Sequence, residues 1–462
     1  MTRRHSGSGS AIAIAAFGLL CSAAPVWAQG YGLYEQSACA MGRAGAGVAA
    51  PCDDGSSMYF NPAGLALDMK TLVSGGGTTL SPRGNFQDKN TNLVSPLSDK
   101  TYFAPNLYFS TPIGDRTVVG VGLFAPYGLS VDWPTTSQGR YVSYQSSVHS
   151  IYVQPTVAYK VNDHLLVGFG LDITHTSLEL RKRVDLSVQQ ITGAPPGVTF
   201  GAIGVPAGTD FADVDLTGGS THAGVHVGVI VKATDQVSIG GRYMSRQTVS
   251  FPGSSIATTQ IPTGLVLQAP LPGVPAGTPI DALVAPAFAA GAPLGPQGAS
   301  TTLPLPDQFV LGVAVKATDQ VRVFADYQYT HWSLLDQIDI QTTVPPNQIY
   351  VLNFGDTNGF RMGAEYSLER AIVRAGFDVH GAAAPDESVT PLLPEASRFE
   401  ITGGLTWPFD QHSAIHVAYM YVDQSDRAGR TVPGGLTPTT ALNNGTYHYY
   451  ANLFGASFVY RF

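Results

Sequence analysis

The sequence has few charged residues and, after its first thirty positions, no long apolar run. Charged residues make up 13% of 462 positions, against roughly 25% in soluble domains, which argues against an ordinary cytosolic enzyme. No run of about 18 apolar residues follows the N-terminus, so a bundle of membrane-spanning helices is excluded. The formal net charge is −8, so the chain offers no basic footprint for nucleic acid.

Motifs for catalysis are also missing. The sequence contains no G-x-S-x-G elbow, no H-E-x-x-H motif and no Walker loop, and its 11 histidines have no ligand spacing. Gly45-x-Gly47-x-x-Ala50 looks like a dinucleotide fingerprint, but no predicted strand precedes it. We therefore expect no enzyme, no catalytic residue, no metal and no cofactor. A hydrolase assembled from distant strands is the one enzyme alternative.

Residues 1–28 have the pattern of a secretory signal peptide. A basic start at Arg3 and Arg4 precedes an apolar stretch from Ala11 to Leu20, and Val26-Trp27-Ala28 then forms the cleavage pattern. Cys21 allows a lipoprotein anchor as an alternative, although Leu20 stands where such a site needs a small residue. Cleavage after Ala28 is the prediction.

Two cysteines, Cys39 and Cys52, remain in the mature chain. In an oxidising compartment they are expected to form a disulfide, which would stabilise the fold by roughly 3 kcal/mol in the chain-entropy model. Two free thiols are the alternative.

From about residue 70 onward, stretches of alternating apolar and polar or small residues are separated by turns, which indicates β-hairpins in series. Between 222 and 231 one face carries valines and the other carries Gly and His. The heptapeptide Val231–Val237 recurs as Val315–Val321, each time as a predicted turn. One face of such strands suits lipid and the other suits water.

Six tight turns alternate with seven longer connections, so the sequence predicts fourteen strands. Short turns at one end and long loops at the other are typical of a bacterial outer-membrane β-barrel, which also has an even number of strands. We therefore predict an all-β, antiparallel transmembrane barrel over residues 69–462, in contact with outer-membrane lipid. The long connections are predicted near 81–100, 127–146, 181–221, 252–307, 342–358, 382–397 and 425–446, and the tight turns near 112–115, 161–164, 233–236, 317–320, 367–370 and 408–412.

The last strand carries the clearest local pattern. Phe454, Phe458, Tyr460 and Phe462 share one face, and the chain ends on Phe462. A terminal aromatic residue with alternating aromatics before it resembles the signal read by the barrel assembly machinery. An ordinary half-buried strand is the alternative.

The strand positions that alternate with the lipid-facing ones carry charged residues. We expect these positions to face the lumen, because charges are costly toward lipid. A network of paired charges that stiffens the wall is the simplest interpretation. The set comprises Lys160, Asp172, His226, Arg242, Arg322, Asp326, Arg361, Glu365, Arg374, Asp378 and Glu400.

Residues 29–68 precede the first predicted strand and are too long for a terminal stub. Together with several short motifs they resemble the outer-membrane long-chain fatty acid transporter family (FadL type), which includes channels for aromatic hydrocarbons. The resemblance spans nearly the whole mature chain. It is carried by Gly42–Gly47, Asp53-Asp54, Asn61-Pro62-Ala63-Gly64, Leu303–Asp307, Tyr329–Ser333, Arg374–Phe377, Pro385-Asp386 and Leu393–Glu395.

This resemblance implies that residues 29–68 form an N-terminal hatch inside the barrel. It further implies that Asn61, Pro62, Ala63 and Gly64 lie near a ligand pocket, for which a plain turn is the alternative. A lateral opening in the third strand would include Gly120, Gly122, Pro126 and Gly128, where Pro and Gly weaken a strand. The alternative there is a strand that ends at Pro126.

The segment 252–307 is unusually apolar for a loop in water, and exposed apolar patches usually mark binding sites. By the resemblance, it would form an external collecting groove with 181–221; packing as a cap is the alternative. The groove candidates are Leu265, Leu267, Leu283, Val284 and Phe288.

The expected function is passive transport of hydrophobic small molecules, long-chain fatty acids or related hydrocarbons, across the bacterial outer membrane. Parity alone makes Arg322, Arg361 and Arg374 the candidates for holding a ligand carboxylate. The alternative function is a general polar-solute porin, and nothing in the sequence suggests more than a monomer.

Overall fold

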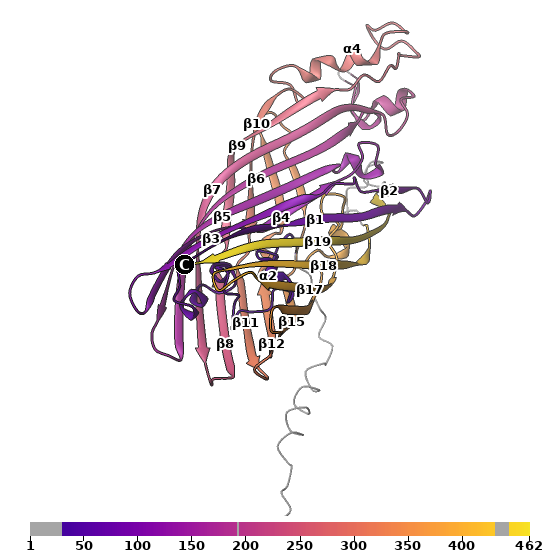
Figure 1. Ribbon diagram of the computed structural model, residues 1–462. Helices are drawn as coiled ribbons and strands as arrows, with labels where there is room; N and C mark the ends of the chain where they lie inside the picture. Colours follow the sequence, from indigo (N-terminus) through magenta and orange to yellow (C-terminus); the bar gives the residue numbers. More distant parts are fainter. Residues whose placement is uncertain (1–29, 192–193, 430–442) are drawn as a thin grey trace, which may run out of the picture.

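The structure is a computed structural model that describes residues 30–191, 194–429 and 443–462. The predicted signal peptide, residues 1–28, and part of the predicted loop 425–446 lie outside these ranges. Within the described residues, fourteen antiparallel strands form a closed barrel, as the turn pattern predicts (Figure 1). The barrel closes where β1 pairs with β19, with Leu72 opposite Arg461.

Ten barrel strands are continuous, and four are each interrupted and continue as a second segment. The continuous strands are β1 (Leu72–Asp88), β3 (Tyr102–Pro112), β4 (Thr117–Asp132), β5 (Gln145–Lys160), β6 (Leu165–Asp185), β7 (Asp210–Lys232), β16 (Ile372–His380), β17 (Arg398–Pro408), β18 (Ser413–Ala428) and β19 (Gly445–Arg461). The interrupted ones are β8 (Val237–Met244) with β9 (Gln247–Gln260), β10 (Gln297–Leu305) with β11 (Gln308–Lys316), β12 (Val321–Thr330) with β13 (Gln337–Thr342), and β14 (Gln348–Val351) with β15 (Thr357–Ser367). The short β2 (Val94–Pro96) adds to β1.

Side chains alternate between the two faces of the wall. In β19, Phe454, Phe458 and Tyr460 are exposed, whereas Leu453 and Val459 are buried. An apolar outer face and a packed inner face suit a wall that stands in lipid. The lumen-facing charged residues expected from parity are buried, except for Lys160 and Arg322.

The six tight turns fall where the sequence predicts them, but most of the long loops are shorter than expected, and two of them differ most. Strands β6 and β7 pair as far as Asp185 and Asp210, so their loop spans only 186–209. Strands β9 and β10 likewise reduce the predicted loop 252–307 to 261–296. These strand ends are rich in Ser, Thr, Asp and Arg, although one face still buries residues such as Phe211, Val214 and Ile256, and so they lack the clear alternation that reveals a strand.

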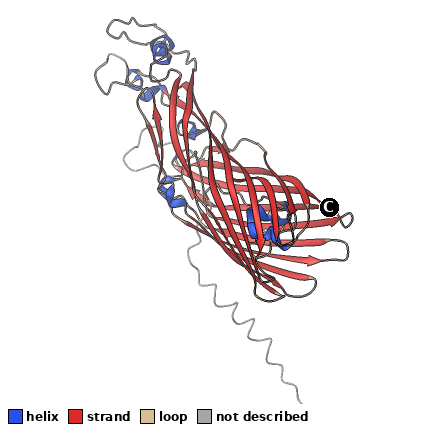
Figure 2. Ribbon diagram, turned by 90° about the vertical axis from the view of Figure 1, so that its left-hand side faces the viewer, coloured by secondary structure: helices blue, strands red, loops and turns tan. Residues whose placement is uncertain are grey.

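The segment 30–68 lies inside the barrel: Figure 1 shows α2 of this segment among the strands, and Figure 2 shows helices enclosed by the strands. It forms α2 (Ala38–Met41), α3 (Ser57–Phe60) and η1 (Pro62–Leu67). Helix α2 contacts β17, β18 and β19, and η1 contacts β5, β6 and β7, so the segment spans the lumen between distant strands. We call residues 30–68 the plug.

The other short helices lie in the connections. They are η2 (Gln138–Tyr141), η3 (Leu186–Val188), η4 (Phe200–Ile203), α4 (Ile280–Val284), η5 (Ala285–Phe288), η6 (Trp332–Leu334) and η7 (Asp386–Ser388). None of the helices in the described residues combines the length and the hydropathy of a membrane span.

Candidate functional site

Asn61 anchors the plug to the barrel wall. Its backbone is extended, as the following Pro62 favours, and its side-chain oxygen accepts from the Ala63 N–H at 3.1 Å. Its amide nitrogen donates to the carbonyl of Val48 at 2.7 Å and to that of Val229, on β7, at 3.0 Å. None of the residues Asn61, Pro62, Ala63 and Gly64 lines the three cavities described below, and the hydrogen bonds of Asn61 attach the plug to the wall.

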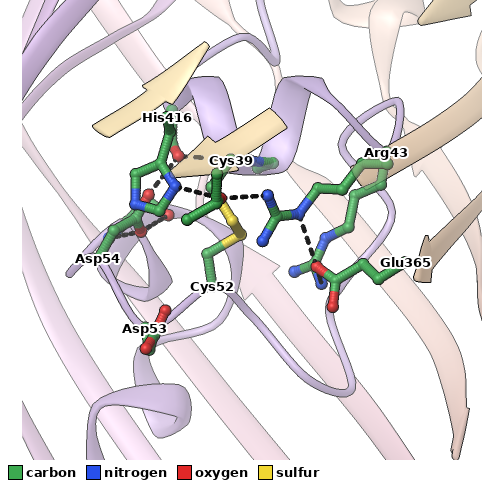
Figure 3. The surroundings of a disulfide bond; sticks show 12 residues. Cys39, Arg43, Cys52, Asp53, Asp54, Glu365 and His416 are labelled. Carbon is green, nitrogen blue, oxygen red and sulfur yellow. Dashed lines mark hydrogen bonds and ion pairs between the residues drawn. A yellow bond between two sulfur atoms is a disulfide. The ribbon is translucent and has the colours of Figure 1, made fainter. Parts of the chain in front are cut away.

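A disulfide and buried ion pairs stand beside each other in the plug (Figure 3). Cys39 and Cys52 are joined as a disulfide. Arg43, in the same segment, donates to Glu365 on β15 at 3.1 Å. Its guanidinium also lies 4.2 Å from the centre of the Phe324 ring. Asp326 on β12 accepts from two further backbone N–H groups of the plug. Charge therefore holds the plug to one side of the barrel.

The three arginines proposed for a ligand carboxylate already have acidic partners. Arg322 and Arg374 both pair with Glu365, and Arg361 pairs with Asp378 at 2.9 Å. None of the three lines the cavities described below. Parity identified them as lumen-facing but could not reveal their partners on neighbouring strands. This geometry does not support their assignment to a ligand carboxylate.

Strand β4 leaves its neighbour β3 halfway along its length. Their pairing ends at Leu107 and Leu123, although β4 continues to Asp132. At the same level, the pairing of β4 with β5 shifts register between Phe124 and Tyr127. The strand therefore does not end at Pro126; it bends away from β3, as a bulge allows.

Part of the plug binds the free edge of this bend. The Leu33 N–H donates to the Pro126 carbonyl at 2.8 Å, and the Gly128 N–H donates to the Tyr31 carbonyl at 3.0 Å. The Gln36 amide adds two hydrogen bonds to the backbone of the same bend. The plug thus satisfies backbone groups that β3 has left, which a closed barrel needs in lipid.

A cavity of about 270 Å³ lies at the bend. Its lining includes Tyr127, which is buried, and Phe103, which is 62% exposed on the outer face of β3. Residues from both faces of the wall therefore line one space, which we call the lateral cavity. Pro126 and Gly128 lie at this bend, and Gly128 is part of the lining.

Gly120 and Gly122 have a different position from the one expected. Both lie in the part of β4 that still pairs with β3, outside the lateral cavity. A Cβ atom on Gly120 would stand 2.3 Å from the Met58 side chain, so this glycine lets the plug approach the wall. The geometry does not support an opening at these two glycines, because glycine serves close packing as well as bending.

A second cavity, of about 50 Å³, continues inward, and we call it the inner pocket. It shares Tyr31, Leu129 and Leu393 with the lateral cavity. Most of its other lining is aliphatic, with residues such as Leu178, Leu303 and Ile340 from three further strands. An apolar pocket with this lining suits a hydrocarbon.

The largest of the three spaces, about 820 Å³, lies between the loops 186–209 and 261–296. We call it the loop groove; Figure 1 shows α4 at this far end of β9 and β10. Leu283 and Val284 line it, as expected. Leu265, Leu267 and Phe288 do not: Leu267 is buried, and the other two pack against the apolar cluster under the groove. The two loops therefore form a groove and also pack on each other through the apolar cluster beneath it.

Arg398 is a feature of the site that the sequence did not reveal. It lines the lateral cavity and donates to the Gly30 carbonyl at 3.1 Å. Glu395 lines the same cavity and accepts from two backbone N–H groups, and its burial raises the pKa of its carboxyl group. The only sequence signal for Arg398 is its place three residues after the motif Leu393–Glu395. For a ligand with a carboxylate, Arg398 replaces the three paired arginines as the candidate cation.

A closed antiparallel barrel with an occupied lumen and a cavity through its wall defines a class of membrane channel proteins. The family model described as outer membrane protein transport protein (OMPP1/FadL/TodX) matches residues 19–462. The chain belongs to this family, and it is an outer-membrane transport protein.

Several known proteins are similar to this chain in sequence or fold. The chain is 21% identical over 472 residues to the long-chain fatty acid transport protein of Salmonella typhi, covering 100% of each. A FadL homologue from Pseudomonas aeruginosa shares the fold with a TM-score of 0.76 and 19% identity, covering 94% of this chain and 99% of that one. The P. putida toluene transporter TodX gives a TM-score of 0.65 and 15% identity, covering 94% and 99%.

Proposed function

We propose that this protein passively carries hydrophobic small molecules across the outer membrane and releases them sideways through its wall. The observation that carries the proposal is the lateral cavity, which joins inward-facing and lipid-facing residues where β4 leaves β3. An apolar molecule would gain roughly 25 cal/mol for each Å² that it buries. It would first enter the loop groove, then the inner pocket, and then the lateral cavity.

The substrate class follows from relatives rather than from one residue. Relatives are named for long-chain fatty acid transport and for toluene transport. Aliphatic lining of the inner pocket and an arginine at the lateral cavity are compatible with both classes. We further propose that the protein works as a monomer and that the barrel assembly machinery reads the alternating exposed aromatic residues of β19.

A polar-solute porin is the alternative function, and the position of the plug argues against it. Residues 30–68 cross the lumen and bind strands on several sides, which leaves the side of the barrel as the route with apolar lining. A porin needs an open aqueous lumen instead.

Uptake measurements on one blocking variant test the proposal. Gly128→Phe puts a large side chain into the lateral cavity, where a Cβ atom already comes within 2.8 Å of Leu33. Cells that lack their own channel and express this variant should take up labelled oleate or toluene at least about tenfold more slowly than wild type, since a filled path leaves no apolar route.

Gly253→Phe is the matched control, because Gly253 lies on β9 with open space around it. It should keep wild-type uptake. A labelled sugar should enter through neither protein. Sugar entry through the wild type, or unchanged oleate and toluene uptake by Gly128→Phe, would argue for the porin.

A further inference from the structure

Three potential metal ligands meet inside the barrel, away from the cavities. Asp378 and His380 lie on β16 and Glu400 lies on β17. Asp378 stands opposite Glu400 in the register, so both side chains point into the lumen, and His380 follows on the same face. One ligand atom from each residue lies within 4.8 Å of the others, and all three residues are buried.

The protein does not satisfy these groups by itself. Glu400 is 5% exposed and has no hydrogen-bond or ion-pair partner in the part of the chain that the structure describes. Asp378 uses one oxygen for Arg361 and His380, while its other oxygen, Oδ1, is buried without a partner there. A buried carboxylate without a partner is costly, so this place lacks a positive group.

The surrounding charges show the same deficit. Asp378 and Glu35 are the acidic neighbours of Glu400, and Arg398 and Arg361 are its basic neighbours. Three carboxylates therefore face two guanidinium groups. Either a proton or a cation would compensate the one excess negative charge. A cation would in addition give the unpartnered Asp378 Oδ1 atom and the His380 imidazole a ligand role.

We propose that Asp378, His380 and Glu400 bind a divalent transition-metal ion of the zinc type. An imidazole nitrogen with carboxylate oxygens is a donor set that zinc accepts, whereas calcium and magnesium prefer oxygen alone. The ring of Tyr34 stacks on His380 with centres 6.3 Å apart, and Glu35 is the next residue of the plug. The ion therefore links β16 to β17 where Tyr34 of the plug lies against them, beside the segment that covers the bend of β4.

Metal binding by the purified protein tests this site directly. The full mature protein in detergent is stripped with EDTA, loaded with Zn²⁺, desalted and analysed by mass spectrometry for metal. Wild type should retain about one zinc per chain, as a site with three protein ligands does. Glu400→Gln and His380→Gln should each lower the retained zinc at least about tenfold, since each removes a ligand.

His175→Gln is the control, because His175 is an exposed histidine outside the cluster. It should keep the wild-type amount. Anomalous diffraction from zinc-soaked wild-type crystals should give a peak between the three side chains, and this result does not depend on the folding of a variant. Wild type without zinc, unchanged zinc in both variants, or a peak elsewhere would overturn the proposal. The result is independent of the uptake test, so either proposal can fail alone.

Discussion

The side-chain amide of Asn61 forms hydrogen bonds with three separate segments. Its nitrogen reaches carbonyl groups of the plug loop and of β7, and its oxygen caps η1. An amide supplies both donors and an acceptor, so one buried side chain can do this where a hydroxyl could not. The sequence identified Asn61 as important, but its role in this geometry is to hold the plug.

Asn61→Ala should weaken the attachment of the plug. The Val48 carbonyl and the Ala63 N–H would lose their side-chain partner in a fully buried place, at a cost of about 1–3 kcal/mol. The folded band on a semi-native gel should disappear at a lower temperature than for wild type. Asn90→Ala, on an exposed loop residue, is the control. Equal melting of the two variants would contradict the anchoring role.

At the scale of elements, one bend and one pair of loops create the spaces that the chain offers to a ligand. Strand β4 bends because its backbone shifts register beside β5 and then loses β3. The loop groove forms because α4 and η4 each present an apolar side over a shared cluster. Pro, Gly and apolar loop residues in the sequence indicated the bend of β4 and the loop groove. The length of the strands that lead to the groove could not be predicted, because their polar ends lack a strand-like alternation.

Leu283→Asp should impair capture of the ligand and leave the later steps intact. Leu283 lines the loop groove, and replacing an apolar contact there by a carboxylate removes up to about 1.5–3 kcal/mol of burial. The oleate or toluene concentration for half-maximal uptake should rise several-fold, with an unchanged maximum rate. Ala282→Asp, one residue earlier and outside the groove lining, is the control. The same half-maximal concentration in both variants would refute a capturing groove.

At the scale of the whole molecule, buried charges add to the hydrogen bonds that join the plug and the barrel into one structure. Glu365 receives Arg43 from the plug and Arg322 and Arg374 from the wall. Breaking a buried pair leaves an uncompensated charge and typically costs about 3–5 kcal/mol. The plug stays in the lumen because its departure would separate Arg43 from Glu365 and leave both charges without this partner.

Glu365→Gln should therefore loosen the plug. Three arginines would lose their shared carboxylate, and we expect the ionic conductance of the protein in planar lipid bilayers to rise above that of wild type. Asp163→Asn, which changes an exposed acid in a tight turn, should behave as wild type. A closed lumen in Glu365→Gln would show that packing and the remaining hydrogen bonds are sufficient to hold the plug.

The sequence by itself determined the number of strands, their tight turns and the sides that face lipid and lumen, because alternation and turn chemistry are local properties of the chain. It also singled out the plug segment by its length and its motifs. Only the tertiary structure decided which charges pair, since Arg43 and Glu365 are 322 residues apart and meet through the register of the closed barrel. The lateral cavity, the role of Arg398 and the cluster around Glu400 depend on the same closure, which no local pattern records.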